Sequence, residues 1–263
     1  MPIAAYADFA GRNHSMHLEN SLDPRQNKLI AALPPAVIER IGPQLEPFWF
    51  SNGDVIMETA EPIDAVYFPS DLVASFEQVV TLPGESFDLT PGVALTGNEG
   101  ALGVELYLGG QTAINRATVR MAGMAFRIKA RPLREEFARG GALQRLLLKA
   151  ADALFAQISG TAACERLHTT AQRVTRWLLV SHDRANGKDL MWTQDSLAHL
   201  IGVRRESISI AARQLQADGL IKYQRGSIMI VDRERLEAQA CQCYREIKTR
   251  YDLLYESESE SES

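Results

Sequence analysis

Two arginines, a glutamate and a serine stand close together in the last third of the chain, at Arg204, Arg205, Glu206 and Ser209. An arginine can donate hydrogen bonds to both acceptors of guanine, and a glutamate can accept one from the amino group of cytosine. Side chains of these types reach base edges when they project from the N-terminal end of a helix into the major groove. We therefore predict that these four residues contact bases of double-stranded DNA.

The surrounding sequence predicts two helices joined by a tight turn. Thr193 is a good N-cap for a first helix of about two turns, and Gly202 supplies the left-handed backbone that a tight turn needs. The second helix is expected over about 204–217, followed by a short β hairpin with strands at 220–223 and 227–231. Together these elements predict a winged helix-turn-helix.

Further residues of this segment suit contacts with phosphates, which position a protein on DNA without reading its sequence. They are Thr193, Arg213, Lys222 and Arg225. The alternative for such residues is a solvated, charged helix face. We favour DNA contact because the glycine turn, the hairpin and the local positive charge agree with one another.

Charge is unevenly distributed along the chain, whose net charge is −5. Residues 166–235 carry +5 and the remainder carries −10. Part of the remainder is the alternating Glu and Ser run over 256–263, which cannot bury apolar surface and is expected to be a disordered acidic tail. Because DNA binding depends on the local field of one face, the negative total does not exclude a nucleic-acid partner.

Changes in sequence texture predict an α+β chain. From Phe48 to Arg131, short β-rich stretches alternate with Gly, Pro and Asn, which is typical of a β-roll or jelly roll. Apolar residues then recur at helical spacing. The predicted parts are an N-terminal arm (1–28), a β-roll sensor domain (29–131), a dimerisation helix (132–165), a winged helix-turn-helix domain (166–235) and a C-terminal helix with the acidic tail (236–263).

The predicted long helix has an apolar stripe. Its members are Leu143, Leu147, Ala150, Leu154 and Ile158. A stripe of this length calls for a partner helix, so we predict that it forms the interface of a homodimer. The alternative is that the helix packs on its own β domain.

The cysteines do not predict a disulfide framework or a metal site. There are three, Cys164, Cys241 and Cys243. We expect Cys241 and Cys243 to lie on one helix from Arg233 to Tyr255, where residues two apart point to different faces, and interpret them as packing residues. The five histidines show no chelating spacing. We therefore expect neither a metal nor another cofactor.

Enzymes and membrane proteins are disfavoured. The sequence offers no convincing nucleophile–base pair and no phosphate-cradling glycine loop, so we expect that the chain is not an enzyme. No apolar run approaches the roughly 20 residues that span a bilayer, and the first residues lack the layout of a secretory signal. We expect a cytoplasmic protein with no membrane partner.

The segment GVRRESISIAARQLQADGLI resembles the recognition segment of the Crp/Fnr family of bacterial transcriptional regulators. Nearly the whole chain fits that family's architecture of a cyclic-nucleotide-binding-like β-roll, a long dimer helix and a winged unit. The resemblance implies that Arg205 and Glu206 read bases and that Ser209 occupies a position used by the Fnr branch. Ile210 departs, because the family commonly has a second base-reading arginine there, and Arg204 replaces a small capping residue and offers a compensating contact.

The same resemblance implies double-stranded DNA, a second copy of the chain and RNA polymerase as partners. In the family, a β-roll cassette similar to G-E-L followed by Arg-Ser-Ala binds cyclic nucleotide, with the arginine against the phosphate. Here Glu99 lies near the glutamate position, while Gln111 and Thr112 stand where Arg-Ser is expected. A buried phosphate without its arginine is costly, so these three residues form a candidate effector pocket that has lost the sign of cyclic nucleotide.

Two alternatives remain for the function. One is a regulator that still responds to a cyclic nucleotide, and the other is a protein-interaction module whose winged helix does not bind DNA. Arg205 and Glu206 argue against the second. Iron–sulfur sensing of the Fnr type is rejected, because it needs N-terminal cysteines and none occurs before Cys164. The effector is therefore unknown or absent.

Overall fold

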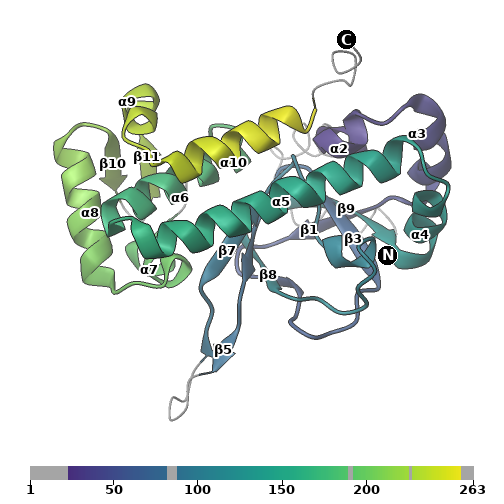
Figure 1. The fold of residues 1–263 in the computed structure, drawn as a ribbon, viewed down its shortest axis with the longest axis horizontal. Coiled ribbons are helices and arrows are strands. Elements are labelled where there is room, and N and C mark those ends of the chain that lie inside the picture. Colours follow the sequence, from purple (N-terminus) through teal and green to yellow (C-terminus); the bar gives the residue numbers. More distant parts are fainter. Residues whose placement is uncertain (1–22, 82–87, 189–191, 225–226, 256–263) are drawn as a thin grey trace, which may run out of the picture.

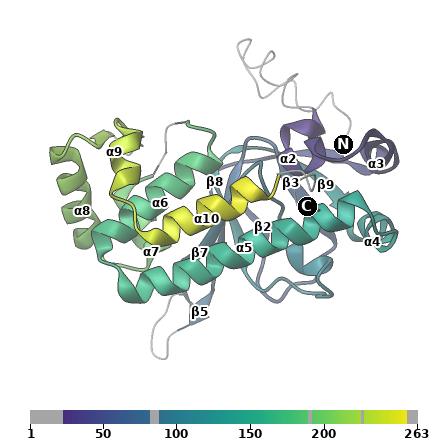
Figure 2. The same cartoon turned by 45° about the horizontal axis from the view of Figure 1, so that its top comes forward.

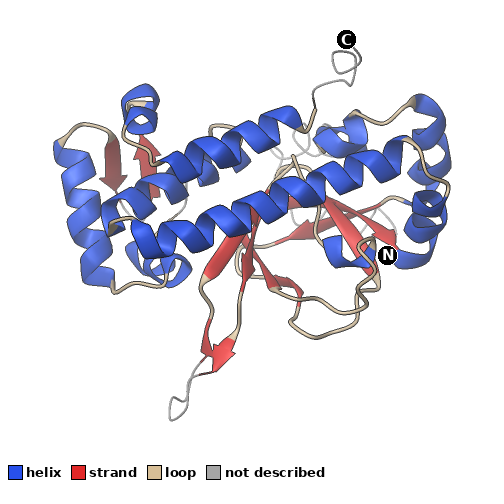
Figure 3. Ribbon diagram, in the orientation of Figure 1, coloured by secondary structure: helices blue, strands red, loops and turns tan. Residues whose placement is uncertain are grey.

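The computed structural model describes residues 23–81, 88–188, 192–224 and 227–255 (Figure 1). Most of the expected N-terminal arm, the acidic tail and Arg225 lie outside the described residues. Figure 3 shows strands gathered on one side of a long helix and a mainly helical unit at one end of the molecule. The predicted α+β fold, with a β-roll, a long helix and a winged helix-turn-helix, is confirmed.

Short helices precede the β-roll. They are η2 (Pro24–Gln26), α2 (Lys28–Ala31), α3 (Pro35–Ile41) and η3 (Gly42–Gln44). Asn27 begins α2: its side-chain oxygen accepts hydrogen bonds from the backbone of Leu29 and Ile30, and its Nδ2 donates to the carbonyls of Pro69 and Gly100 at 2.9 Å each. One buried amide thus caps the helix and attaches it to the roll.

The β-roll is built from antiparallel sheets. Within the described residues, one sheet has the strand order β1-β9-β3, a second has the order β2-β8-β4-β7, and β5 pairs with β6. The strands are β1 (Glu46–Phe50), β2 (Val55–Met57), β3 (Ala65–Pro69), β4 (Val73–Glu77), β5 (Val80–Thr81), β6 (Asp88–Leu89), β7 (Gly92–Thr96), β8 (Arg116–Met121) and β9 (Gly123–Lys129), with η4 (Val104–Leu106) between β7 and β8. Alternation along β4 sends Ala74 and Phe76 into the roll's own core.

A short helix and a glycine turn connect the roll to the long helix. Strand β9 runs into α4 (Ala130–Ala138), and the pair Gly140–Gly141, both with positive φ, turns the chain into α5 (Ala142–Leu167). Helix α5 crosses the molecule from the N-terminal helices to the far end (Figure 1). It has 26 residues and packs against α4, β7 and α10.

The C-terminal unit contains the predicted winged helix-turn-helix. Its elements are α6 (Thr170–Arg184), α7 (Gln194–Ile201), α8 (Arg205–Ala217), β10 (Ile221–Gln224), β11 (Ser227–Ile230), α9 (Arg233–Ala238) and α10 (Gln242–Leu253). Trp177, Leu197, Ile208 and Leu215 are buried together in its core. Each comes from the apolar side of its helix, which leaves the polar side of α8 free to face outward.

The prediction of one C-terminal helix over 233–255 is wrong. Helix α9 ends at Ala238, Cys241 has the extended backbone of an N-cap residue, and a separate helix, α10, begins at Gln242. The break redirects the chain so that α10 lies alongside α5 (Figures 1 and 2). Its buried side, with Tyr244, Ile247 and Tyr251, covers one flank of the long helix.

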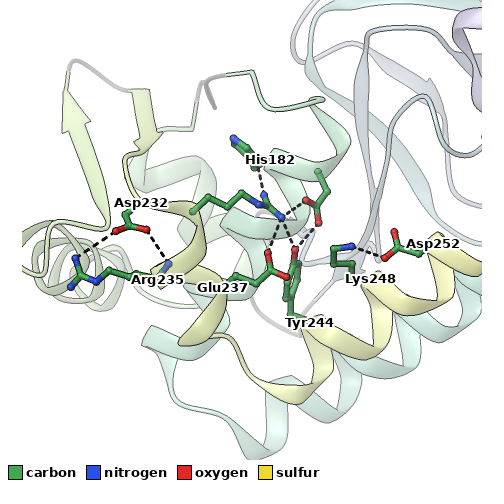
Figure 4. A network of polar contacts seen from close by, with 9 residues as sticks. His182, Asp232, Arg235, Glu237, Tyr244, Lys248 and Asp252 are labelled. Carbon is green, nitrogen blue, oxygen red and sulfur yellow. Dashed lines mark hydrogen bonds and ion pairs between the residues drawn. The ribbon is translucent and has the colours of Figure 1, made fainter.

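A polar network attaches α9 and α10 to α6 (Figure 4). Arg233 donates to Asp183 at 2.6 Å, to the hydroxyl of Tyr244 at 2.7 Å and contacts His182 Nδ1 at 2.7 Å. The Tyr244 hydroxyl donates in turn to the second oxygen of Asp183 at 3.0 Å. The C-terminal helix is thereby held both to α5 and to the helix-turn-helix unit.

The roll and the C-terminal unit are joined by a buried ion pair. Arg184 at the end of α6 lies 3.0 Å from Glu99 of the roll, and both side chains are 6% exposed. The Arg184 Nη2 donates to Gln157 of α5 at 2.8 Å, and the guanidinium stacks 3.8 Å from the centre of the Tyr251 ring. Burial by itself lowers the pKa of Arg184, but the charge of Glu99 and nearby tyrosines outweighs it and raises that pKa.

The joint also depends on close packing. Val73 and Leu95 of the roll belong to the same buried cluster as Trp177 of the C-terminal unit. A Cβ added to Gly97 would lie 2.6 Å from the carbonyl oxygen of Arg184, closer than any ordinary contact. The two units therefore share one core. None of the described helices is long and apolar enough to cross a membrane.

Replacing Glu99 by glutamine tests the ion pair. Glu99→Gln is expected to lower the free energy of unfolding by about 3–5 kcal/mol, because it leaves the buried Arg184 without a counter-ion. Urea unfolding at neutral pH measures the change.

The matched control is Glu135→Gln. Glu135 pairs with Arg131 on the surface, with side chains 63% and 90% exposed, and its loss is expected to cost less than about 1 kcal/mol. Similar small losses for both variants would contradict the role assigned to the buried pair.

Candidate nucleic-acid interface

The helix-turn-helix is built by local signals that the sequence displays. Thr193 and Ser196 form a capping box at the start of α7, in which the Ser196 backbone N–H donates to Thr193 Oγ1 at 3.0 Å. Helix α7 ends at Gly202 with φ 70°, a left-handed conformation that favours glycine. The following α8 begins at Arg205, one residue later than expected, with Arg204 as its N-cap residue.

The predicted base-reading residues come together at the start of α8. Arg204, Arg205 and Glu206 are exposed, and Ser209 is half-buried. Arg205 lies 3.3 Å from Asp195 of α7 in an ion pair whose partners are more than 60% exposed. Such a pair contributes about 1 kcal/mol or less, so Arg205 can exchange it for a guanine at little cost.

Ser209 is engaged with the neighbouring helix. Its hydroxyl donates to the side-chain oxygen of Gln194 at 2.6 Å, and its carbonyl accepts from Arg213 Nε at 3.2 Å. The hydroxyl can still accept a hydrogen bond while it donates to Gln194. We call the exposed surface at the start of α8, with Arg204, Arg205 and Glu206, the reading face. Ser209 therefore lies at the edge of this face, between α7 and α8, rather than at its centre.

Ile210 is a further candidate for base contact. From the sequence alone, it is only a departure from the arginine that the family commonly has at this position. It is 63% exposed and lies on the outer side of α8, four residues after Glu206 and three before Arg213. An apolar side chain in the major groove can contact the methyl group of thymine. The sequence feature that could have identified this contact is an isoleucine on an otherwise polar face of the predicted helix.

The predicted phosphate contacts surround this face. Thr193 at the N-cap of α7, Arg213 on α8 and Lys222 on β10 are exposed. Arg225 lies outside the described residues. The hydroxyl of Thr193 already serves as the cap of α7. The backbone and side chains at this end of α7 are positioned as phosphate contacts commonly are, beside a helix N-terminus.

The apolar stripe predicted for α5 faces the protomer's own core. Leu143, Leu147 and Ala150 are buried in the cluster that contains the N-terminal helices and α10, and Leu154 and Ile158 pack partly against the roll. The alternative interpretation, packing on the chain's own domain, therefore describes the first three residues. Apolar residues at helical spacing indicate that one face of a helix is buried, but they do not indicate which element packs against that face.

A different seam of α5 is open. A second apolar series on α5, with alternating three- and four-residue spacing, is exposed or half-exposed: Leu148, Ala151, Phe155, Ile158 and Ala162. Phe155 is 71% exposed and Leu148 is 43% exposed. The seam continues into a groove between β7, α5 and the α7–α8 turn, which is lined by Ile158, Ala162, His199 and Arg204, among others.

The candidate effector residues do not form one pocket. Glu99 is buried against Arg184, and its backbone carbonyl accepts from Tyr255 Oη at 2.5 Å. Gln111 and Thr112 are exposed, and pair through their backbone with Ile63 and Pro62. The carboxylate that would hold a ribose hydroxyl is thus committed to the joint between the roll and α6.

The C-terminal unit matches a known domain family. Residues 172–239 match the Crp-like helix-turn-helix domain. No curated protein sequence matches the chain.

Solved structures resemble the chain over most of its length. FixK2 from Bradyrhizobium japonicum has a TM-score of 0.64 and 17% identity, covering 75% of this chain and 98% of that chain. The c-di-GMP-responsive global regulator CLP from Xanthomonas campestris has a TM-score of 0.56 and 18% identity, covering 75% and 99%. A CRP/FNR-family transcriptional regulator from Thermus thermophilus has a TM-score of 0.57 and 20% identity, covering 74% and 98%.

These likenesses define the class. The chain has the fold of Crp/Fnr-type transcriptional regulators and carries their helix-turn-helix domain at residues 172–239. Regulators of this class bind DNA and act as dimers.

Calorimetric titration with cyclic AMP and cyclic GMP tests the interpretation that the β-roll does not bind a cyclic nucleotide. We expect no heat of binding from either nucleotide, because Glu99 is engaged by Arg184 and no arginine stands at Gln111. Micromolar binding of either nucleotide would overturn this interpretation.

Proposed function

We propose that the protein is a sequence-specific DNA-binding transcriptional regulator of bacterial type, which acts as a homodimer in the cytoplasm together with RNA polymerase. The observation that carries the proposal is the exposed start of α8, where Arg205 and Glu206 project from a helix-turn-helix of the Crp-like family. This is the end of a recognition helix that meets base edges in the major groove. The proposed role is regulatory and not enzymatic.

The reading face gives the proposal chemical detail. Arg205 would bond the two acceptors of a guanine, and Glu206 would accept from a cytosine amino group. Ile210 would contact a thymine methyl group where relatives commonly place an arginine, so the half-site would differ from theirs at one or two base pairs. Arg204 and Ser209 would add contacts at the edge of the face.

Phosphate contacts would fix the register of the complex. Thr193 and Arg213 flank the reading face, and Lys222 extends the basic surface to the wing; Arg225 belongs to the same proposal, although it lies outside the described residues. Contacts of this kind contribute affinity for any sequence and make binding sensitive to salt.

The dimer would form along the open seam of α5. Leu148, Ala151, Phe155, Ile158 and Ala162 follow the alternating three- and four-residue spacing of a coiled-coil interface. Pairing two copies through this seam would place two α8 helices on one side of the assembly, where they could enter successive major grooves about 34 Å apart. Of the apolar stripe predicted from the sequence, only Ile158 would belong to this interface, and the other members pack inside the protomer.

The β-roll would act without a cyclic nucleotide. The joint of Arg184 with Glu99 and Gln157 favours one fixed placement of the helix-turn-helix on the roll. An effector could change DNA binding only by preferring another placement, and so would have to compete with this joint. We therefore propose binding to DNA that needs no cyclic nucleotide.

Arg205→Ala tests the assignment of the reading face. The variant is expected to lose about 1–3 kcal/mol of binding free energy at the cognate site and to relax the preference at one base pair. Fluorescence anisotropy with cognate and scrambled duplexes at fixed salt measures both.

The matched control is Arg131→Ala, which removes a 90% exposed arginine on α4, at the other end of the molecule from α8 (Figure 1). It should bind like the unmodified protein. An equal loss on cognate and scrambled DNA in Arg205→Ala would mean that Arg205 contacts phosphate.

Phe155→Glu tests the seam. A buried glutamate at the centre of the interface is costly, so the variant is expected to sediment as a monomer while it keeps its helical circular-dichroism signal. Leu167→Glu, at another exposed apolar position of α5 outside the seam, should remain dimeric. A dimer that survives Phe155→Glu would contradict the proposed interface.

A further inference from the structure

The three cysteines and one histidine converge at the junction of the long helix and the C-terminal helix. Cys164 and His168 are one helical turn apart at the end of α5, while Cys241 caps the start of α10 and Cys243 lies in its first turn. The ligand atoms of the four residues all lie within 4.8 Å of one another. Cys241 and Cys243 can point the same way because Cys241 has extended backbone, which the expectation of a continuous helix did not allow.

The distances within this group fit one tetrahedral ion. Zinc binds sulfur at about 2.3 Å and imidazole nitrogen at about 2.0–2.1 Å, so tetrahedral geometry separates two sulfurs by about 3.8 Å and a sulfur and a nitrogen by about 3.6 Å. Here Cys164 Sγ and Cys241 Sγ are 3.9 Å apart. Cys243 Sγ and His168 Nδ1 are 3.7 Å apart.

The surroundings supply a compensating charge. All three cysteines are buried, and beside them Arg176 is fully buried. Its Nη1 donates to Thr161 at 3.1 Å, whereas its Nε and Nη2 have no hydrogen-bond partner within the described part of the chain. A divalent ion with three thiolates carries one net negative charge, which a buried guanidinium would balance.

We propose that Cys164, His168, Cys241 and Cys243 bind one Zn²⁺ ion in a closed, structural Cys₃His site. Each cysteine would bind as a thiolate, releasing its thiol proton to solvent, and His168 would bind as a neutral imidazole through Nδ1. No electron is transferred. Thiolate and imidazole ligands in tetrahedral array are the set that zinc occupies in structural sites.

A disulfide explains less of the arrangement. Oxidation could join Cys164 to Cys241, but it would leave Cys243, His168 and the free donors of Arg176 without a role. A zinc ion uses all four side chains and gives the Arg176 charge a partner.

The position of the site gives the ion a mechanical role. His168 is the C-cap residue of α5, and Thr169 caps the next helix, α6. The ion would tie the end of α5 to the start of α10, just where the chain turns into the helix-turn-helix unit. It would thereby hold α10 in the place where Tyr251 stacks on Arg184.

Cobalt substitution of the full-length protein is the direct test. The protein purified without chelators should contain one zinc per chain by elemental analysis. After the metal is removed under reducing conditions, titration with Co²⁺ should produce the intense visible bands of a tetrahedral ion and a sulfur-to-cobalt charge-transfer band, both saturating at one equivalent. Zinc should displace the cobalt and bleach the bands.

Variants separate the proposed ligands from other residues. Cys243→Ser and His168→Gln should each weaken zinc binding by more than about 100-fold, the upper end of the loss when only a supporting partner of a ligand is removed. His199→Gln, which changes a histidine outside the cluster, should bind zinc like the unmodified protein.

The proposal is overturned if the unmodified protein gives no tetrahedral cobalt spectrum, or if mass spectrometry after alkylation without reduction finds a Cys164–Cys241 disulfide in place of metal. Both readouts use the unmodified protein, so they remain informative if a variant fails to fold. Neither involves DNA, so failure of the metal site and failure of the proposed DNA-binding function are distinguishable.

Discussion

The guanidinium of Arg184 lies where four parts of the fold meet. It pairs with Glu99 of the roll, bonds Gln157 of α5, belongs to α6 and stacks on Tyr251 of α10. A buried ion pair contributes little net stability compared with apolar packing, but it tolerates few alternative arrangements, since a misplaced charge would be buried without a partner. Gly97 permits the close approach that the pair requires. This contact, together with the apolar core that the two units share, holds the helix-turn-helix against the roll.

This constraint bears on the candidate effector residues of the β-roll. Glu99, which the family resemblance compares with a ribose-binding glutamate, pairs with Arg184, and Gln111 stands where that resemblance expects an arginine. The roll keeps the architecture of a ligand-binding domain while its polar side chain holds the neighbouring unit. Any signal from the roll that reaches α8 would have to pass through this joint or through α6 and α7, because α8 packs on these two helices.

Sequence reasoning worked best where structure is decided by neighbouring residues. The capping box at Thr193, the left-handed turn at Gly202 and the apolar side of α8 are local signals, so the helix-turn-helix could be predicted almost to the residue. The apolar stripe of α5 is also local, but its partner is not. The sequence indicated that Leu143 and Leu147 are covered, and only the tertiary structure identifies α10 and the N-terminal helices as what covers them.

Contacts between distant residues could not be predicted in this way. Nothing near Glu99 indicates that its partner is Arg184, and the grouping of Cys164 with Cys241 depends on a helix break that brings α10 back along α5. The one available signal for that cluster was the four-residue spacing of Cys164 and His168, which corresponds to about one helical turn.

Selection of bound sequences from a pool of random duplex DNA tests the central claim most directly. If a homodimer reads the major groove through α8, the enriched sequences will contain two inverted half-sites whose centres lie one helical turn, about 10 base pairs, apart. Each half-site will contain a guanine whose preference depends on Arg205. Failure to enrich any sequence, or enrichment of a single asymmetric site, would contradict the claim.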